Sequence, residues 1–295
     1  MRKIIIHLGL PKTGTTSLQF GLFKKLDNFK YLCRPYIHMD IEKIFNSIIM
    51  DSNIKFESNI EKYQSIVEEY SDTKDIMISN EALMNASLYP EGISSKVIFE
   101  RLKSIFNELG DLKFILVLRD QVTIIPSYFA QFEKNISFED YINKGIKDNY
   151  SIFSNLYYDR LLNELYEIYD EENILCLRFE DFKENKELFA EKLSSFLLLN
   201  FESTLNRLNI HKNKKSSEKG THIRKYSFYD FLLAFKSKII KKELNLKRFK
   251  LTKYLVKYLN NVNINTNEVH INKEQKKRII EKYKIDSENI LKKSI

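Results

Sequence analysis

HLGLPKTGTTSLQ, residues 7–19, places two glycines, Gly9 and Gly14, at the spacing of the phosphate-binding motif G-x-x-x-x-G-K-[ST]. The position after Gly14 is Thr15, where that motif requires a lysine, and the nearest lysine, Lys12, lies inside the loop. In nucleoside triphosphatases the motif lysine reaches the terminal phosphates. The displaced lysine therefore argues against ATP as the ligand, while the glycine spacing still favours a phosphate-binding loop.

The residues around this loop indicate a strand, a turn and a helix. Residues 3–8 (KIIIHL) form an apolar run typical of a buried parallel strand, and leucines recur every fourth position from Leu18 to Leu26 on one helical face. A helix that starts near Thr15 points its free N–H groups and the positive end of its dipole at the loop, which favours phosphate or sulfate. The hydroxyls of Thr15, Thr16 and Ser17 add donors there.

The segment from Pro11 to Thr16 (PKTGTT) resembles the 5′-phosphosulfate loop P-K-[ST]-G-T-[TS] of sulfotransferases that use 3′-phosphoadenosine 5′-phosphosulfate (PAPS), particularly bacterial members and heparan-type carbohydrate enzymes. The resemblance implies PAPS as co-substrate, adenosine 3′,5′-bisphosphate (PAP) as product, and no metal. It also implies that the backbone from Thr13 to Ser17 cradles the 5′-phosphosulfate, and that Lys12 neutralises charge on the bridging oxygen as the S–O bond breaks. The alternative is the phosphate loop of another P-loop protein.

A second motif, FILVLRDQVTIIPSYFAQF, repeats the strand-to-helix pattern. Phe114 to Leu118 form an apolar run that indicates a buried strand, Arg119 follows it, and a helix is expected from Thr123 to Phe132. In the family, an arginine at such a strand end and a serine eight residues later grip the 3′-phosphate, and Arg119 and Ser127 have that spacing. A guanidinium offers phosphate a bidentate fork, and a helix hydroxyl adds a donor. Considered alone, Arg119 would be a surface ion-pair partner of Asp120.

A third run, DIMIS at 75–79, indicates a middle strand that the chain leaves through Asn80 and Glu81. Ligands of open α/β sheets bind outside the carboxyl ends of the strands, near the point where the strand order reverses, so Glu81 is placed to reach a substrate. The carbohydrate sulfotransferases carry a catalytic glutamate after the corresponding strand, which implies that Glu81 is the general base. Partial burial would raise its pKa and help it to accept a proton from a sugar hydroxyl. Alternatively, Glu81 caps the helix that begins near Ala82.

Strands alternating with helices predict an α/β fold, a P-loop-type three-layer sandwich with a central parallel sheet and helical additions. The expected strands are 3–8, 30–34, 74–79, 112–118 and 173–178, and the expected helices are 16–27, 39–70, 95–108, 122–133, 155–169 and 186–198. Because the sequence contains only 7 glycines and 4 prolines, no linker is evident. We expect one sulfotransferase domain over 1–295, with a basic, mainly helical C-terminal third from about residue 205.

Two turns follow from the resemblance. The segment from Arg178 to Phe182 resembles an architectural turn of the family, which we expect a salt bridge from Arg178 to the adjacent acids to hold. A late loop of the family closes over the adenosine through a glycine and basic residues, and HKNKKSSEKGTHIRK (211–225) is the candidate, with Lys219 and Gly220 as contacts. It lacks the strict R-K-G signature, and a solvated lysine-rich linker is the alternative.

Positive charge is concentrated in residues 211–258, which contain 15 Lys and Arg against 3 Asp and Glu, whereas the whole chain has a formal net charge of +8. This asymmetry indicates an acidic partner. Within it, Phe228, Phe231 and Phe235 share a helical face that is followed by lysines, and such a basic amphipathic segment can lie on an anionic membrane. The alternative is that the aromatic face packs on the core and the lysines face solvent.

Other residue types narrow the chemistry. His7, at the end of the first strand, either supports the loop or packs. Cys33 and Cys176 are isolated and no His/Cys cluster has ligand spacing, so we expect no metal site. No run approaches the roughly 18 apolar residues that span a bilayer, and Met1 to Leu10 is too short for a secretory signal. We therefore expect a cytoplasmic protein, with any membrane contact peripheral at the inner membrane face.

Together these features predict an enzyme that transfers a sulfuryl group from PAPS to a hydroxyl of a carbohydrate or glycolipid, with Lys12 and Glu81 as catalytic residues. An ATP-dependent P-loop kinase is one alternative, which the missing lysine after Gly14 disfavours. A non-catalytic basic protein that binds membranes or nucleic acid is another. The intact phosphate loops argue against it, and we expect no nucleic-acid partner.

Overall fold

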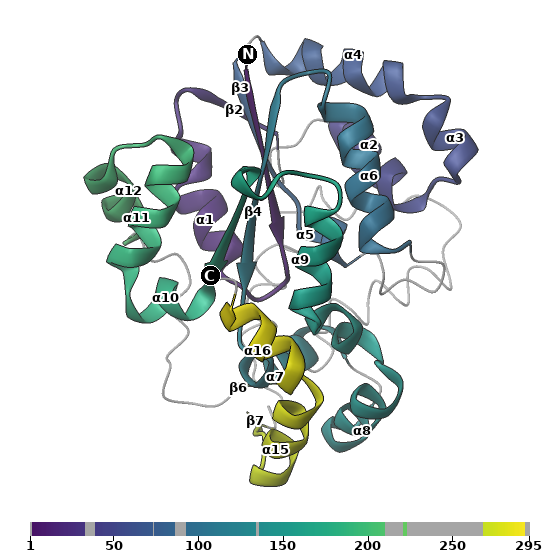
Figure 1. The fold of residues 1–295 in the computed structure, drawn as a ribbon, viewed down its shortest axis with the longest axis vertical. Helices are drawn as coiled ribbons and strands as arrows, with labels where there is room; N and C mark the ends of the chain where they lie inside the picture. The colour runs from purple at the N-terminus through teal and green to yellow at the C-terminus, as the bar shows by residue number, and fades with distance from the viewer. Residues whose placement is uncertain are drawn as a thin grey trace, which may run out of the picture.

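A five-stranded parallel sheet forms the centre of the molecule, with strand order β2-β3-β1-β4-β5 (Figure 1). The computed structural model describes residues 2–32, 39–72, 74–85, 93–133, 136–209, 221–222 and 268–292. The strands are β1 (Lys3–Gly9), β2 (Phe29–Tyr31), β3 (Asp75–Ser79), β4 (Asp111–Leu118) and β5 (Ile174–Arg178). Every pair in the sheet is parallel, as the sequence predicts.

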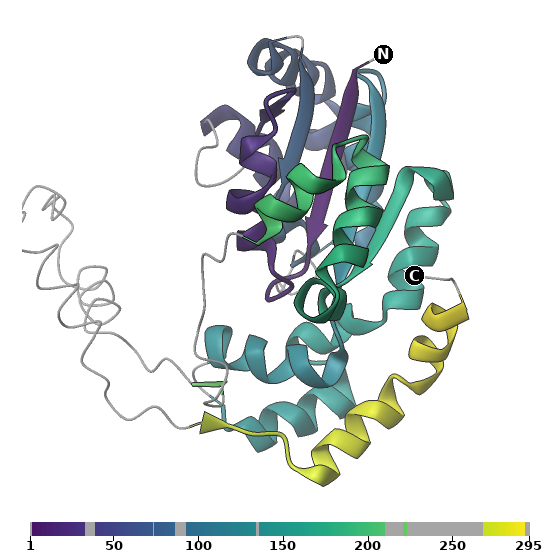
Figure 2. The same cartoon turned by 90° about the vertical axis from the view of Figure 1, so that its left-hand side faces the viewer.

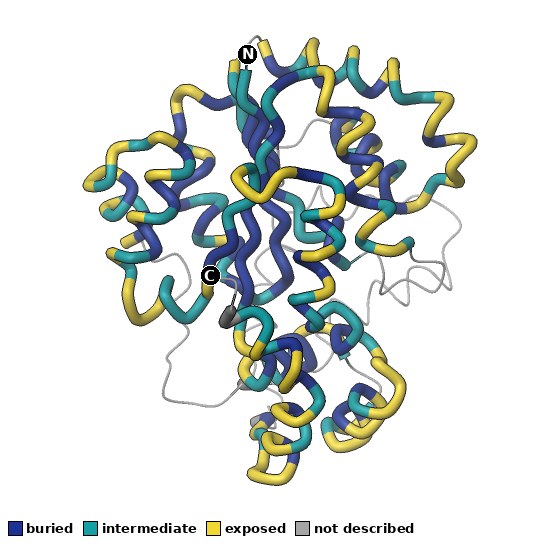
Figure 3. The backbone as a smooth tube through the Cα atoms, viewed as in Figure 1, coloured by how far each residue is buried: buried dark blue, intermediate teal, exposed yellow. Residues whose placement is uncertain are grey.

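Both faces of the sheet are buried, which explains why its strands are continuous apolar runs (Figure 3). Alternate residues of a strand point to opposite faces. Ile4 and Ile6 of β1 therefore belong to one hydrophobic cluster, and Ile5 between them belongs to the other. The two clusters form the two cores of a three-layer sandwich, which confirms the expected fold class.

The helices divide between the two faces. The side chains of α1 (Thr15–Gly21), α11 (Lys186–Leu197) and α12 (Phe201–Leu208) pack into the cluster that contains Ile5. The opposite cluster takes side chains from a larger group, which consists of α2 (Met39–Met50), α4 (Ile60–Ser71), α5 (Glu81–Met84), α6 (Ser95–Phe106) and α9 (Tyr158–Tyr166). Figure 1 shows these two groups on either side of the sheet.

Further helices lie beyond the carboxyl ends of the strands (Figures 1 and 2). They are α7 (Gln121–Phe132), α8 (Phe138–Asp148), α15 (Lys273–Lys282) and α16 (Lys284–Lys292). A two-stranded antiparallel ladder joins β6 (Thr221–His222) to β7 (Glu268–Val269), and β6 contacts α7. These additions cover the edge of the sheet at which the candidate site lies.

Short elements make up the rest of the secondary structure in the described residues. They are the helix α3 (Asn53–Glu57), the helix α10 (Phe179–Glu184) and three 3-10 turns, η1 (Phe23–Lys25), η3 (Ser151–Leu156) and η4 (Glu171–Asn173). Two of the expected helices need correction, and one helix was not expected. The helix expected over 16–27 ends at Gly21 and continues as η1, the helix expected over 155–169 begins only at Tyr158, and α8 was not expected at all.

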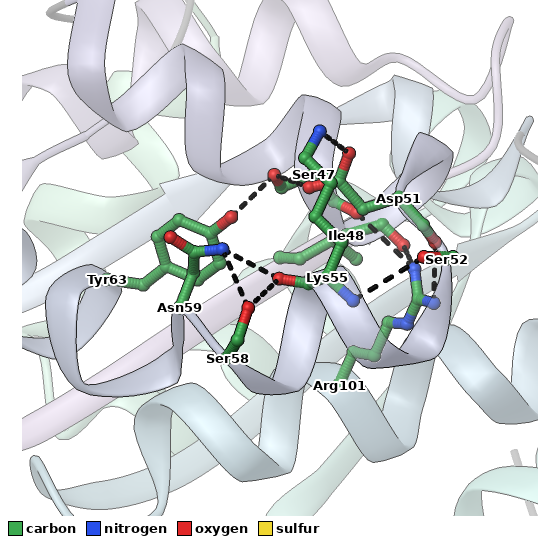
Figure 4. A network of polar contacts seen from close by, with 9 residues as sticks. All are labelled: Ser47, Ile48, Asp51, Ser52, Lys55, Ser58, Asn59, Tyr63 and Arg101. Atoms are coloured by element: carbon green, nitrogen blue, oxygen red, sulfur yellow. Dashed lines mark hydrogen bonds and ion pairs between the residues drawn. The ribbon is translucent and has the colours of Figure 1, made fainter.

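Arg101 of α6 is a buried charge that fastens the carboxyl end of α2 (Figure 4). Its guanidinium donates to the carbonyls of Ile48 and Asp51, both at 2.8 Å, and to Oδ1 of Asn53 at 2.8 Å. It also lies 4.7 Å from the centroid of the Phe56 ring. The last carbonyls of a helix lack intrahelical partners, so this arginine supplies the missing donors and ties α2 to α6.

Candidate active site

The loops after β1 and β4 leave the sheet side by side, because these strands are neighbours with Gly9 opposite Val117. The helices that follow depart to opposite faces, since α1 packs into one hydrophobic cluster and α7 into the other. The strand order therefore reverses between β1 and β4, which is where open α/β sheets bind their ligands. The topology therefore places the two predicted anion-binding motifs side by side at the carboxyl edge of the sheet.

The loop after β1 depends on glycine at two close approaches. A Cβ on Gly9 would lie 3.0 Å from Oγ1 of Thr15. Gly14 has φ +81°, and a Cβ there would lie 3.0 Å from the Phe179 ring. Lys12 also adopts a left-handed backbone, with φ 71°, which is strained for a residue other than glycine. The glycine spacing that defines the motif is thus explained by backbone geometry.

The hydroxyls of this loop are divided between the interior and the surface. Thr13 is buried and donates to the Leu10 carbonyl at 2.7 Å, and Thr15 is also buried. Thr16 is exposed and Ser17 half-buried. The first amides that donate helical hydrogen bonds are those of Ser17 and Leu18, which bond to the Gly14 carbonyl at 2.9 and 3.2 Å. The amides of residues 13–16 come before these bonds. Those earlier amides are the groups of a helix start that can meet an anion.

Arg119 links the two motifs directly. Its Nη1 donates to the Lys12 carbonyl at 2.7 Å, and its Nε donates to Oγ1 of Thr123 at 3.1 Å. The guanidinium carbon lies 4.8 Å from the centroid of the Phe179 ring. Burial lowers the pKa of Arg119 from its ordinary value, although the group stays cationic at neutral pH. The predicted 3′-phosphate arginine therefore lies against the predicted 5′-phosphosulfate loop.

Ser127 lies one turn along α7 from the residue that Arg119 contacts. Thr123 and Ser127 are four positions apart and share one face of the helix. Ser127 is half-buried. Sequence reasoning missed Thr123, although its i, i+4 relation to Ser127 is a signal that could have identified it.

Glu81 lies on the other side of the loop. It is the first residue of α5 and is half-buried. Burial raises the pKa of Glu81, while a hydrogen bond with Thr15 and the charge of Lys12 act in the opposite direction. The cap of α5 is Asn80, whose side chain accepts from the Ala82 amide at 2.9 Å, so the alternative that Glu81 is the cap is wrong. Lys12, Thr15 and Glu81 therefore form one cluster.

His7 supports the strand ends below this cluster. It is fully buried, its Nδ1 lies 2.7 Å from Oγ of Ser79, and Gln19 donates to the same hydroxyl at 2.9 Å. Burial lowers the pKa of His7 to about 3, so the imidazole is neutral at physiological pH. These contacts join His7 to β3 and, through the Ser79 hydroxyl, to α1.

The turn after β5 contacts the loops after β1 and β4. Phe179 packs against Gly14 and Arg119, a contact that sequence reasoning missed because it joins three distant segments. Glu180 accepts from the Asp120 amide at 3.1 Å. This bond, and not the expected salt bridge from Arg178, holds the turn. The Arg178 side chain is exposed. The segment is a short helix, α10, that positions Phe179 and Glu180.

Three further expectations concern the adenosine-closing loop, a metal site and a membrane span. Lys219 and Gly220 lie outside the described residues, although β6 begins at the next residue and contacts α7. Within the described ranges, no group of three or more His, Cys, Asp or Glu side chains could hold a metal ion. In the same part of the chain, no helix combines the length and the apolar character that crossing a membrane requires.

Comparisons with known proteins give the family. A family model described as a sulfotransferase domain matches residues 2–281. Comparison with curated proteins gives no match. Among solved structures, the chain is similar to a sulfotransferase from Alicyclobacillus acidocaldarius, with 13% identity, coverage of 80% of this chain and 92% of that chain, and a TM-score of 0.47. It is also similar to mouse sulfotransferase SULT7A1 complexed with PAP, with 11% identity, coverage of 99% and 87%, and a TM-score of 0.47.

The family match covers nearly the whole chain and agrees with the strand order, the loop geometry and the site that the two loops share. The chain therefore belongs to the sulfotransferase family, whose enzymes take their sulfuryl group from PAPS.

Proposed function

We propose that the protein transfers the sulfuryl group of PAPS to a hydroxyl of an acceptor. The site of this transfer is formed by the loops after β1, β3 and β4. The observation that carries this proposal is the hydrogen bond of 2.7 Å from Arg119 to the Lys12 carbonyl, because it places two cationic anion-binding motifs next to each other. A single nucleotide that carries phosphates at both its 3′ and 5′ positions suits two adjacent anion sites. The positive φ of Gly14, and the Phe179 ring that lies 3.0 Å from where its Cβ would be, explain why this loop has glycine at position 14.

In this proposal each residue has a defined task. PAPS, when bound, supplies an electrophilic sulfur with PAP as its leaving group. The backbone from Thr13 to Ser17 holds the 5′ end through its N–H groups, and Arg119 and Ser127 hold the 3′-phosphate. Lys12 stabilises the negative charge that develops on the leaving oxygen, and Glu81 takes the proton from the attacking hydroxyl. Most of the rate would come from positioning and electrostatics.

Calorimetry with PAP, adenosine 5′-monophosphate (AMP) and ATP tests the nucleotide assignment. We expect wild-type protein to bind PAP more tightly than AMP, and to bind ATP with magnesium more weakly than PAP. Arg119→Ala should lower the affinity for PAP by about tenfold or more, because a charge-assisted bidentate contact is lost, and should lower the affinity for AMP less, because AMP loses only the support that Arg119 gives to the Lys12 carbonyl. Tight magnesium-dependent binding of ATP would instead favour the kinase alternative.

The proposed acceptor is a carbohydrate or glycolipid, since the chain resembles carbohydrate sulfotransferases. Sugar rings stack on exposed aromatic faces, and Tyr150 in the segment after α8 is 41% exposed. Other aromatics of this region, such as Tyr141 and Phe153, are buried and form the core. A screen of capsular and lipopolysaccharide glycans with labelled donor would test the proposal, and transfer only to small phenols or alcohols would contradict it.

We also propose that the protein is cytoplasmic and contacts the anionic inner face of the membrane through its basic segment. The support is compositional, because residues 211–258 carry 15 basic against 3 acidic side chains. Most of this segment lies outside the described residues. Flotation with vesicles of anionic lipid, using wild type and the charge reversal Lys238→Glu/Lys241→Glu/Lys242→Glu, would test the contact. Failure of wild type to float would disprove it.

A further inference from the structure

The amino end of α9 is capped by a carboxylate from the far end of the chain. Tyr157, the residue at its N-cap position, makes no capping hydrogen bond with its side chain. Asp286 of α16 takes that role, because its Oδ1 accepts from the Asp159 amide at 2.8 Å and its Oδ2 accepts from the Tyr158 amide at 3.1 Å. Asp286 is only 7% exposed. The first N–H groups of a helix lack intrahelical partners and favour a negative charge.

The helix end that Asp286 caps also contacts the candidate active site. Tyr158 is buried, and its hydroxyl donates to the Arg119 carbonyl at 2.7 Å. This carbonyl lies between β4 and α7, at the point where the chain changes from sheet to helix. This carbonyl is partly buried, and Tyr158 supplies its hydrogen-bond partner. Asp286 also accepts from Nε2 of Gln121, the first residue of α7, at 3.5 Å.

The turn at Arg119 is therefore held from several directions. Tyr158 fixes its carbonyl, Glu180 accepts from the next amide at 3.1 Å, and the side chain of Asp120 accepts from the Thr123 amide at 3.0 Å. The direction of a side chain follows from its backbone, so these contacts determine where the Arg119 guanidinium points.

We propose that Asp286 and Tyr158 are positioning residues for the anion site. The carboxylate fixes the start of α9, the hydroxyl at that start fixes the Arg119 carbonyl, and the fixed backbone directs the guanidinium to the loop after β1. The inference rests on the proposed function, in which Arg119 binds the 3′-phosphate. The family match ends at residue 281, so Asp286 lies beyond it and the last helix of this chain contributes to the nucleotide site.

The test compares the affinities for PAP and AMP by calorimetry in Asp286→Asn and Tyr158→Phe. Asp286→Asn keeps the size of the side chain but leaves only one oxygen to accept from the two amides, and Tyr158→Phe removes only the hydroxyl. Each should weaken PAP binding about five- to tenfold, the effect of losing one well-placed hydrogen bond. AMP binding should change less than about twofold, because AMP lacks the 3′-phosphate.

Two matched variants separate positioning from general loosening of the C-terminal helices. Asn289→Ala removes a bond of 2.9 Å from α16 to the Asp159 carboxylate, and Tyr283→Phe removes a bond of 2.8 Å to the Phe153 carbonyl. Both should lower the melting temperature as Asp286→Asn does, yet leave the ratio of the PAP and AMP affinities at the wild-type value. A ratio that changes equally in these controls would overturn the inference.

Arg119→Ala distinguishes failure of the inference from failure of the proposed function. If Arg119→Ala lowers the PAP/AMP affinity ratio and Tyr158→Phe does not, the positioning role is wrong and the anion site stands. If Arg119→Ala leaves the ratio unchanged, or wild type binds PAP no better than AMP, both are wrong. Should Asp286→Asn not fold, Tyr158→Phe decides alone. Adding Tyr158→Phe to Arg119→Ala should then cause no further loss.

Discussion

Lys12 belongs to the loop after β1, and its positive charge acts on the Glu81 carboxyl, so the two residues suit opposite electrostatic tasks. We expect Lys12→Ala and Glu81→Gln to keep PAP affinity within about tenfold and to lose turnover by about a hundredfold, because one removes a group that stabilises the developing charge and the other removes the general base. Steady-state assays with labelled PAPS would measure this. Glu133→Gln, which removes an acid from the end of α7, is the control. Normal turnover in Glu81→Gln would remove Glu81 from the mechanism.

The raised pKa of Glu81 gives a pH dependence with a defined sign. A base acts when deprotonated, so kcat/KM should rise with pH through a value above the ordinary glutamate pKa of about 4.3, and this limb should vanish in Glu81→Gln. In this pH range the folded state binds more protons than the unfolded state, so Glu81 lowers stability as pH rises. Glu81→Gln should therefore be more stable than wild type at neutral pH and equal to it in acid, as measured by urea unfolding.

Candidate site residues could be identified from the sequence only where they belong to a local motif. Lys12, Glu81 and Arg119 were predicted, and the structure brings them together. The inward orientation of Thr13 was not evident, because a hydroxyl at that position suits both an anion and the Leu10 carbonyl. Phe179 was missed because its role depends on contacts with Gly14 and Arg119, which lie far away in the sequence.

At the scale of elements, the loop after β1 should be sensitive to a single methyl group. Gly14→Ala adds a Cβ at 3.0 Å from the Phe179 ring and forces alanine into a left-handed backbone, which costs about 1–2 kcal/mol. We expect Gly14→Ala to lower the stability of the protein. It should also lower the affinities for PAP and AMP, because both nucleotides use the 5′ loop. Gly21→Ala, at the end of α1, is the control. Unchanged AMP affinity in Gly14→Ala would show that the loop does not hold the 5′ group.

The end of α2 should be sensitive to the charge that holds it. Arg101→Met keeps a long side chain but leaves the carbonyls of Ile48 and Asp51 without their donor, and should cost about 2–3 kcal/mol in the free energy of unfolding. Lys103→Met on the same helix removes an exposed donor and should change stability by less than about 0.5 kcal/mol. Equal effects in the two variants, measured by urea titration, would contradict the capping role.

Apolar runs identified four of the five strands, whereas the short β2 (Phe29–Tyr31) contains a lysine and overlaps the strand expected over 30–34 only at residues 30–31. Helix ends were also predicted less well. The leucines at 18, 22 and 26 suggested one continuous helix, whereas Leu22 leaves the regular helix with φ −118° and the remainder tightens into η1. Gly21 is the last residue of α1, and glycine has a low helix propensity, which was a signal against a helix that continues to residue 27. α8 was missed although Ser137 accepts from the Asp140 amide at 3.1 Å, which is an ordinary N-cap.

At the scale of the whole molecule, the proposed division between a chemical core and a basic segment can be tested by deletion. A variant in which a short Asn-Gly turn replaces residues 223–267 should fold, because β6 and β7 already pair at that point. We expect its PAP affinity to stay within about threefold of wild type and its flotation with anionic vesicles to be lost. A folded variant that no longer binds PAP would place nucleotide contacts inside the deleted residues.

The ladder of Thr221–His222 with Glu268–Val269 has an evolutionary consequence. Paired strands hold the two ends of an insertion about 5 Å apart, whatever its length or composition. Variation between these ends can therefore accumulate without disturbing the register of the sheet or the packing of α7.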